Sequence, residues 1–187
     1  NPPLHTKMIR TGHQWTQTKV HMPDQNRLGR AGSSDQNVAN TKPYATCPVK
    51  RFADQDLLKV LVRTYRANGT GQETVAQSIE VSRNGSIAAS AYRRLVGWYS
   101  DCQLPRVQLV ASYLVRRPAG DFQILRLRSH STPERTFTVG FSHSGIVTST
   151  LVHEVDGAKG PDITTFARTL NDSVSRVCSD SGGSCTN

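Results

Sequence analysis

Hydrophobic residues recur along the chain with the two-residue period of strands in some places and the 3.6-residue period of helices in others. In residues 73–82, Val75, Ile79 and Val81 fall on one side and small or polar residues on the other, which predicts a half-buried strand. After Pro105 come four strand-like runs in succession, at 107–115, 122–128, 136–141 and 146–155. Because their connections are short and turn-like, we expect these four runs to pair antiparallel as a meander.

Two shorter elements are expected ahead of residue 73. Apolar residues at helical spacing in residues 54–62 predict a short helix, with Leu57 and Leu61 turned inward. This helix would lead into a short strand at 63–67, and the Gly-rich residues 68–71 then predict a turn.

Two longer helices complete the predicted elements. The first is expected over residues 86–102, with Ser86 as its N-cap. The last is expected to begin with Pro161 or Asp162 in its capping region, and its apolar stripe ends at Cys178.

The order of these elements predicts an α+β fold. We expect a mainly antiparallel sheet of about five to six strands with two main helices packed on one face, in the order β-α-β-β-β-β-α. The length of 187 residues suits one domain with a single core. We assign that domain to residues 46–187, and expect residues 1–45, rich in Gln, Asn, Thr and Gly, to form a polar linker or a loosely structured arm.

Charge adds a possible class of partner. Lys and Arg number 23 against 14 acidic residues, a net charge of +9, and the sequence pI is near 9.8. Basic residues occur in doublets such as Arg93-Arg94 and Arg116-Arg117 rather than in long runs, which is typical of a generally basic surface. No stretch approaches the roughly 18 to 20 consecutive apolar residues of a bilayer span.

The four cysteines, Cys47, Cys102, Cys178 and Cys185, form no Cys-x-x-Cys pair, so neither a zinc ribbon nor a thioredoxin-like motif is available. Free buried thiols and two disulfides remain as alternatives. Cys178 and Cys185 bracket a polar, flexible connection, which favours disulfides, and of three connectivities we choose Cys47–Cys102 and Cys178–Cys185. Disulfides imply an oxidising, extracytoplasmic compartment. Because the sequence has no initiator Met and no signal peptide, we expect an excised or processed segment.

One helix carries a resemblance to a known family. The run from Ala91 to Cys102, AYRRLVGWYSDC, follows the alternating strand at 73–82. Together they resemble the PknH-like extracellular domain of actinobacterial membrane serine/threonine kinases, lipoproteins and some sigma-factor-related proteins, over about residues 44–178. The resemblance implies an antiparallel sheet with helices, two disulfides and a cleft for an unidentified ligand. The loop from Cys178 to Cys185 departs from that family's pattern.

The sequence contains few features of a catalytic site. The chain has no Gly-x-Ser-x-Gly, Walker, His-Glu-x-x-His or dinucleotide motif, so we expect no catalytic residues and no cofactor. His143 precedes Ser144, but is expected in a hairpin turn, where catalytic geometry is rarely assembled. His153 and Glu154 are neighbours on a strand and would face opposite sides, so we expect no metal site. Three triplets match glycosylation acceptors by pattern, at Asn68, Asn84 and Asn171.

Candidate ligand contacts come from the predicted geometry. We expect an exposed sheet face opposite the helices, carrying Arg126, Arg128, Arg135, Tyr113 and Gln108. Arginines that converge in a groove there could bind a carboxylate or phosphate with forked hydrogen bonds. The alternative is that these arginines are scattered over a solvated face.

These observations predict a non-enzymatic extracytoplasmic sensor or ligand-binding domain, monomeric and tethered to a membrane only through a part outside this sequence. Its partner would be an unknown small molecule or an anionic component of the cell envelope, and we do not expect nucleic acid. One alternative is a secreted basic protein that binds polyanions or nucleic acid, on charge alone. A small secreted hydrolase using His153 or His143 is the remaining alternative.

Overall fold

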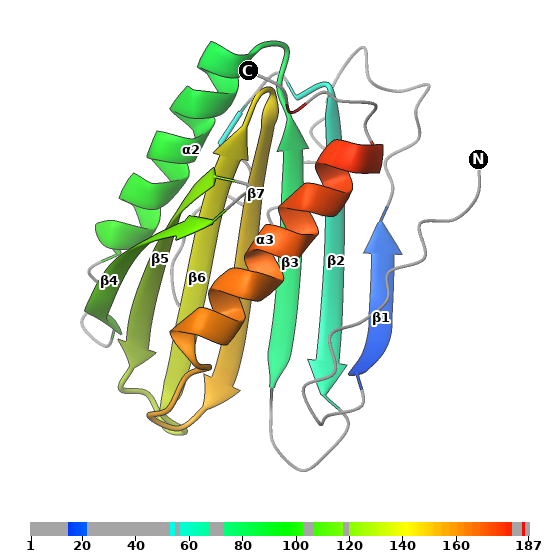
Figure 1. Ribbon diagram of the computed structural model, residues 1–187. Helices are drawn as coiled ribbons and strands as arrows, with labels where there is room; N and C mark the ends of the chain where they lie inside the picture. Colours follow the sequence, from blue (N-terminus) through cyan, green and yellow to red (C-terminus); the bar gives the residue numbers. More distant parts are fainter. Residues whose placement is uncertain are drawn as a thin grey trace.

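The described part of the chain folds into an antiparallel sheet with one helix against each face (Figure 1). A computed structural model describes residues 15–21, 53–54, 57–67, 73–102, 107–117, 120–180 and 185. Its elements, in chain order, are β1 (Trp15–His21), β2 (Lys59–Ala67), β3 (Thr74–Val81), α2 (Gly85–Ser100), β4 (Val107–Arg117), β5 (Gly120–Ser129), β6 (Arg135–Ser144), β7 (Val147–Asp156) and α3 (Ile163–Asp180).

The sheet has seven strands in the order β1-β2-β3-β7-β6-β5-β4, and each neighbouring pair is antiparallel. Strands β4 to β7 form the expected meander, because each short connection returns the chain beside the strand it has just left. The α+β fold class is confirmed. Strand β1 lies within residues 1–45, the segment expected to be a linker or arm.

The helix predicted at 54–62 is wrong: strand β2 begins at Lys59 and continues to Ala67. The leucines of this segment fit helical spacing, but Val60, Val62 and Thr64 are β-branched and favour strands. Pairing decides the outcome, since β2 forms a ladder with β3 in which Val62 lies opposite Ser78. A helix here would have left that side of β3 without hydrogen-bond partners.

The sequence led us to expect both helices on one face of the sheet. This is wrong, because α2 and α3 pack on opposite faces. In β5, Leu125 and Leu127 pack in the cluster beneath α2, whereas Phe122 and Ile124 pack in the cluster beneath α3. Figure 1 shows α3 crossing the near face of the sheet. Because strands such as β5 are apolar on both sides, each face needs its own helix to exclude water.

Helix α3 approaches the sheet closely at Gly140 of β6. A Cβ atom at Gly140 would lie 2.7 Å from Phe166 and 2.8 Å from Leu170 of α3. Both side chains are buried in the cluster beneath α3, so a larger residue at position 140 would push the helix outward.

Helix α2 is capped by Asn84 rather than by the expected Ser86. The Asn84 side-chain oxygen accepts hydrogen bonds from the Ile87 backbone N–H and the Ser86 hydroxyl, both at 3.0 Å. Asn84 is exposed and Asn171 is half-buried within α3, while Asn68, the remaining glycosylation pattern, lies outside the described residues.

A disulfide joins Cys178, near the end of α3, to Cys185, with their Cα atoms 5.2 Å apart. This pairing is confirmed. Cys102 is also disulfide-bonded, and its expected partner Cys47 lies outside the described residues. Neither α2 nor α3 combines the length and the apolar composition that crossing a bilayer requires.

Candidate anion-binding site

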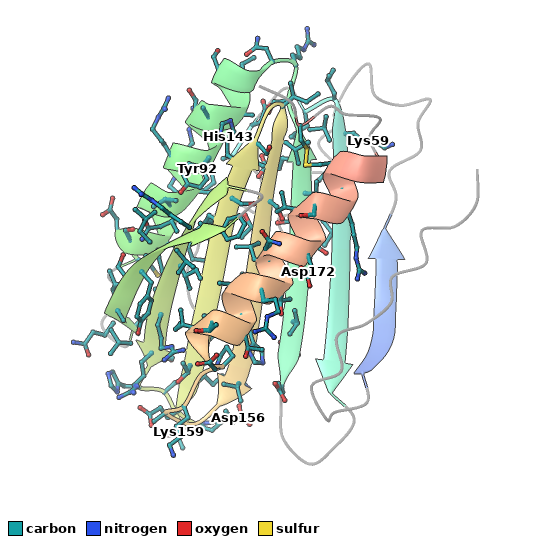
Figure 2. The ribbon with its side chains drawn as sticks, viewed as in Figure 1. Lys59, Tyr92, His143, Asp156, Lys159 and Asp172 are labelled. Carbon is teal, nitrogen blue, oxygen red and sulfur yellow. A yellow bond between two sulfur atoms is a disulfide. The ribbon has the colours of Figure 1, made fainter. Side chains whose placement is uncertain are left out.

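The connection between β7 and α3, residues 157–162, crosses the ends of β5 and β6 at the lower end of the molecule in Figure 1. Asp156 and Lys159, labelled in Figure 2, mark this end. Three side chains of β5 and β6 donate hydrogen bonds to its backbone carbonyls: Thr136 to Gly157 at 2.7 Å, Arg128 to Ala158 at 3.2 Å, and Arg126 to Pro161 at 2.5 Å. The segment is therefore held to the sheet by polar side chains.

Not all of the donors beneath this segment are satisfied. Arg126 Nε and the hydroxyl oxygen of Thr138 are buried and have no hydrogen-bond partner among the described residues, whereas Arg128 Nε lies 3.5 Å from a carboxylate oxygen of Glu134. Thr138 is 0% exposed, so water at the surface does not reach it. Buried donors without acceptors are costly, and they mark places where an unseen water or ion belongs.

Two of these atoms meet at Gly160. A Cβ atom at Gly160 would lie 2.8 Å from the Thr138 hydroxyl oxygen and 3.1 Å from Arg126 Nε. Both atoms therefore lie close to one spot beside the Gly160 backbone. A side chain at position 160 would collide with them, which accounts for glycine there.

The donors belong to a polar row that runs across three strands. Arg126 of β5 is the register partner of Thr138 of β6, and Thr138 is the register partner of His153 of β7. His153 Nε2 lies 2.6 Å from a carboxylate oxygen of Glu73, just before β3. This row contains a guanidinium, a hydroxyl, an imidazole and a carboxylate on the face beneath α3.

Asp162 caps α3 beside this row. Its carboxylate accepts a hydrogen bond from the Thr165 backbone N–H at 2.8 Å, as expected for a residue in the capping region. Hydrogen bonds from Thr165, followed by smaller effects that include the charge of Arg126, hold the pKa of Asp162 below its usual value. The Arg126 guanidinium is thus close to one carboxylate already.

The predicted ligand residues fall into two groups. Arg126 and Arg128 lie together, and Gln108 of β4 is the register partner of Arg128. Tyr113 lies on the same face but packs against the apolar cluster beneath α3. Arg135 lies on the other face, where it contacts Glu154 at 2.5 Å and Asp156 at 3.4 Å.

The expected exposed face opposite the helices is therefore wrong. Arg126, Arg128, Tyr113 and Gln108 lie on the same face as α3, where Arg126 and Arg128 donate to carbonyls of the connection; Gln108 is exposed and Arg128 is partly exposed. The sequence did not single out Thr136, Thr138 and Gly160. Alternation with Phe137 and Val139 places the threonines on one face, but only a second helix makes that face buried.

His143 and Ser144 do not form a catalytic pair. His143 is part of β6 rather than of the expected turn, and its ring centroid lies 6.1 Å from that of Tyr92 of α2. Both residues are labelled in Figure 2. Ser144 donates instead to the Cys185 carbonyl at 3.0 Å. Successive strand residues face opposite sides, so these two side chains point apart.

His153 and Glu154 also point apart, as expected: His153 contacts Glu73, whereas Glu154 contacts Arg135. Within the part of the chain that the structure describes, no three His, Cys, Asp or Glu side chains gather in a way that could hold a metal ion.

Comparison with known proteins adds no relative: no family model, no curated protein and no solved structure matches the chain. The resemblance to the PknH-like extracellular domain stays a prediction from the sequence.

Proposed function

We propose that the protein is a non-enzymatic, extracytoplasmic domain of the sensor type that binds a small carboxylate or phosphate beneath residues 157–162. The observation that carries this proposal is the pair of buried donors without hydrogen-bond partners among the described residues, Arg126 Nε and the Thr138 hydroxyl, with the Arg128 guanidinium beside them. Guanidinium groups form their strongest hydrogen bonds with carboxylates and phosphates. An anion at this place would supply the acceptors that these donors lack.

Binding would compete with the protein's own backbone. Arg126 and Arg128 now donate to the neutral carbonyls of Pro161 and Ala158. An anion attracts a guanidinium through its charge and can accept two parallel hydrogen bonds from it, which a single carbonyl cannot, so an anion would draw the guanidinium groups away from these carbonyls. Residues 157–162 would then lift from the sheet, and the start of α3 would move with them. This coupling is what a sensor requires.

The disulfide supports the proposed location. Cys178 is joined to Cys185, and Cys102 is also oxidised, as is usual for proteins in oxidising compartments. The domain would therefore meet its ligand outside the cytoplasm.

The test is a titration of the whole chain with inorganic phosphate and with acetate, in which amide chemical shifts measured by NMR report binding. We expect saturable shifts at residues 157–162 and at Thr138. Thr138→Val removes only the unpartnered hydroxyl, so it should weaken phosphate binding about tenfold while leaving stability unchanged or higher. Arg126→Gln is compared with Arg93→Gln, which removes the same charge at an exposed position on α2. The control variant Arg93→Gln should bind phosphate normally.

Absence of saturable shifts, or equal weakening in Arg93→Gln and Arg126→Gln, would refute the proposal. The alternative interpretation, a polyanion binder, predicts no binding of inorganic phosphate. It predicts binding of long polyphosphate or DNA with an affinity that rises steeply as the salt concentration falls.

A further inference from the structure

We propose that the outer edge of β4 docks an extended, acidic peptide segment with apolar residues at alternate positions, which adds to the sheet as a further strand. This inference does not depend on the anion site, because β4 offers its edge whether or not that site is occupied.

Strand β4 is the last strand of the sheet and pairs with β5. Its Val107–Arg117 span is 11 residues. An edge strand presents a row of backbone N–H and C=O groups that have no partner within the sheet, which is the template used in strand addition.

Exposed apolar side chains gather on this strand. Four large hydrophobic residues are exposed in the part of the chain that the structure describes, and three of them, Leu109, Val110 and Leu114, belong to β4. Leu114 is the most exposed of them, at 61%. Clustered apolar side chains on a surface commonly mark a place where another chain binds.

The strand also lacks most of the features that keep edges from pairing. From Leu109 to Val115 it contains no charged residue and no proline. A register shift between Leu109 and Ala111 disturbs its first part. The regular stretch is then 111–117, which spans about 23 Å and suits a partner strand of about seven residues.

Charge decides which occupant fits this edge. The strand ends in Arg116 and Arg117, and Asp121 is the register partner of Arg116, so these three residues have a net positive charge. A second copy of the chain has the same net charge of +9, which opposes its association at this edge. An acidic peptide would be attracted instead, and its apolar residues would cover Leu114.

The test uses a fluorescein-labelled heptapeptide, Glu-Val-Thr-Val-Thr-Val-Glu, and fluorescence anisotropy with the whole chain. We expect saturable binding that weakens as salt rises, and no binding by the same peptide with proline in place of its central Val, since proline cannot donate to the ladder. Leu114→Ser should raise Kd about tenfold because it removes the apolar contact. Leu114→Thr, which keeps β propensity, should weaken binding in the same way.

Leu58→Ser is the matched control, since Leu58 is 42% exposed but lies outside β4, just before β2. It should bind the peptide as the unchanged chain does. No saturable binding up to about 1 mM peptide, or equal weakening by Leu58→Ser, would overturn the proposal. A dimer in light scattering that Leu114→Ser dissociates would also overturn it, because the edge would then bind a second copy.

Discussion

Glu80 is a carboxyl group buried on β3, with only 1% of its surface exposed. It accepts hydrogen bonds from the backbone N–H groups of Ala53 and Asp54, at 3.1 to 3.2 Å, and Arg94 of α2 donates to the Ala53 carbonyl at 2.6 Å. Burial nevertheless raises the pKa of Glu80 to about 7, because the hydrogen bonds and Arg94 only partly offset the loss of hydration, and Asp54 adds repulsion. The side chain fastens residues 53–54 to the sheet.

This raised pKa predicts that stability falls as pH rises from about 5 to 8. Below the unfolded pKa of 4.5, Glu80 is protonated in both states. Above that value the unfolded chain releases the proton, while the folded chain keeps it until about pH 7, so the loss reaches about 3 kcal/mol. Denaturant unfolding of the unchanged chain and of Glu80→Gln at pH 5 and 8 measures it, since the variant cannot titrate. Parallel pH dependence in the two proteins would contradict this origin.

Among the elements, helix α2 was predicted correctly except for its N-cap residue. The helix itself was predicted, but its cap is Asn84 and not Ser86, two residues later. Both residue types cap helices, and only the backbone shows which one stands in the extended conformation that a cap requires. Strand β2 shows a larger effect of tertiary structure. Its residues have helical spacing, but they form a strand because they pair with β3.

The cap can be tested directly. Asn84→Ala removes the acceptor for the Ile87 N–H and should lower the free energy of unfolding by about 1 kcal/mol. Ser86→Ala, at the position that the sequence had suggested, removes only an exposed hydroxyl and should change stability by less than about half of that. Chemical denaturation of both variants provides the measurement. A larger effect at Ser86 than at Asn84 would show that the cap is misassigned.

At the scale of the whole molecule, the helices on the two faces bury two separate apolar clusters, and a disulfide joins α3 to Cys185. The Ser144 hydroxyl donates to the Cys185 carbonyl, so Cys185 lies at the end of β6. Cys185 is therefore linked to α3 covalently and to the sheet by a hydrogen bond.

Opening that link should destabilise the fold without abolishing it. The paired change Cys178→Ser and Cys185→Ser releases a loop with a sequence separation of 7, and the entropy of the unfolded chain then rises. On the loop-entropy estimate the free energy of unfolding drops by about 2.5 kcal/mol. Thermal and denaturant unfolding of the paired variant measure this drop. An unchanged midpoint would mean that the bond constrains neither state.

The sequence by itself determined which segments become β3 to β7, α2 and α3, and which two cysteines close the last loop. Each of these depends on residues close together in the chain, and their spacing is the same however the elements pack against one another. The tertiary structure alone decided that the helices cover opposite faces, that residues 59–67 pair with β3, and that Arg126 and Arg128 hold the backbone before α3. Those outcomes depend on which surfaces meet, and strands that are apolar on both sides, like β5, do not specify from local pattern which helix each side will receive.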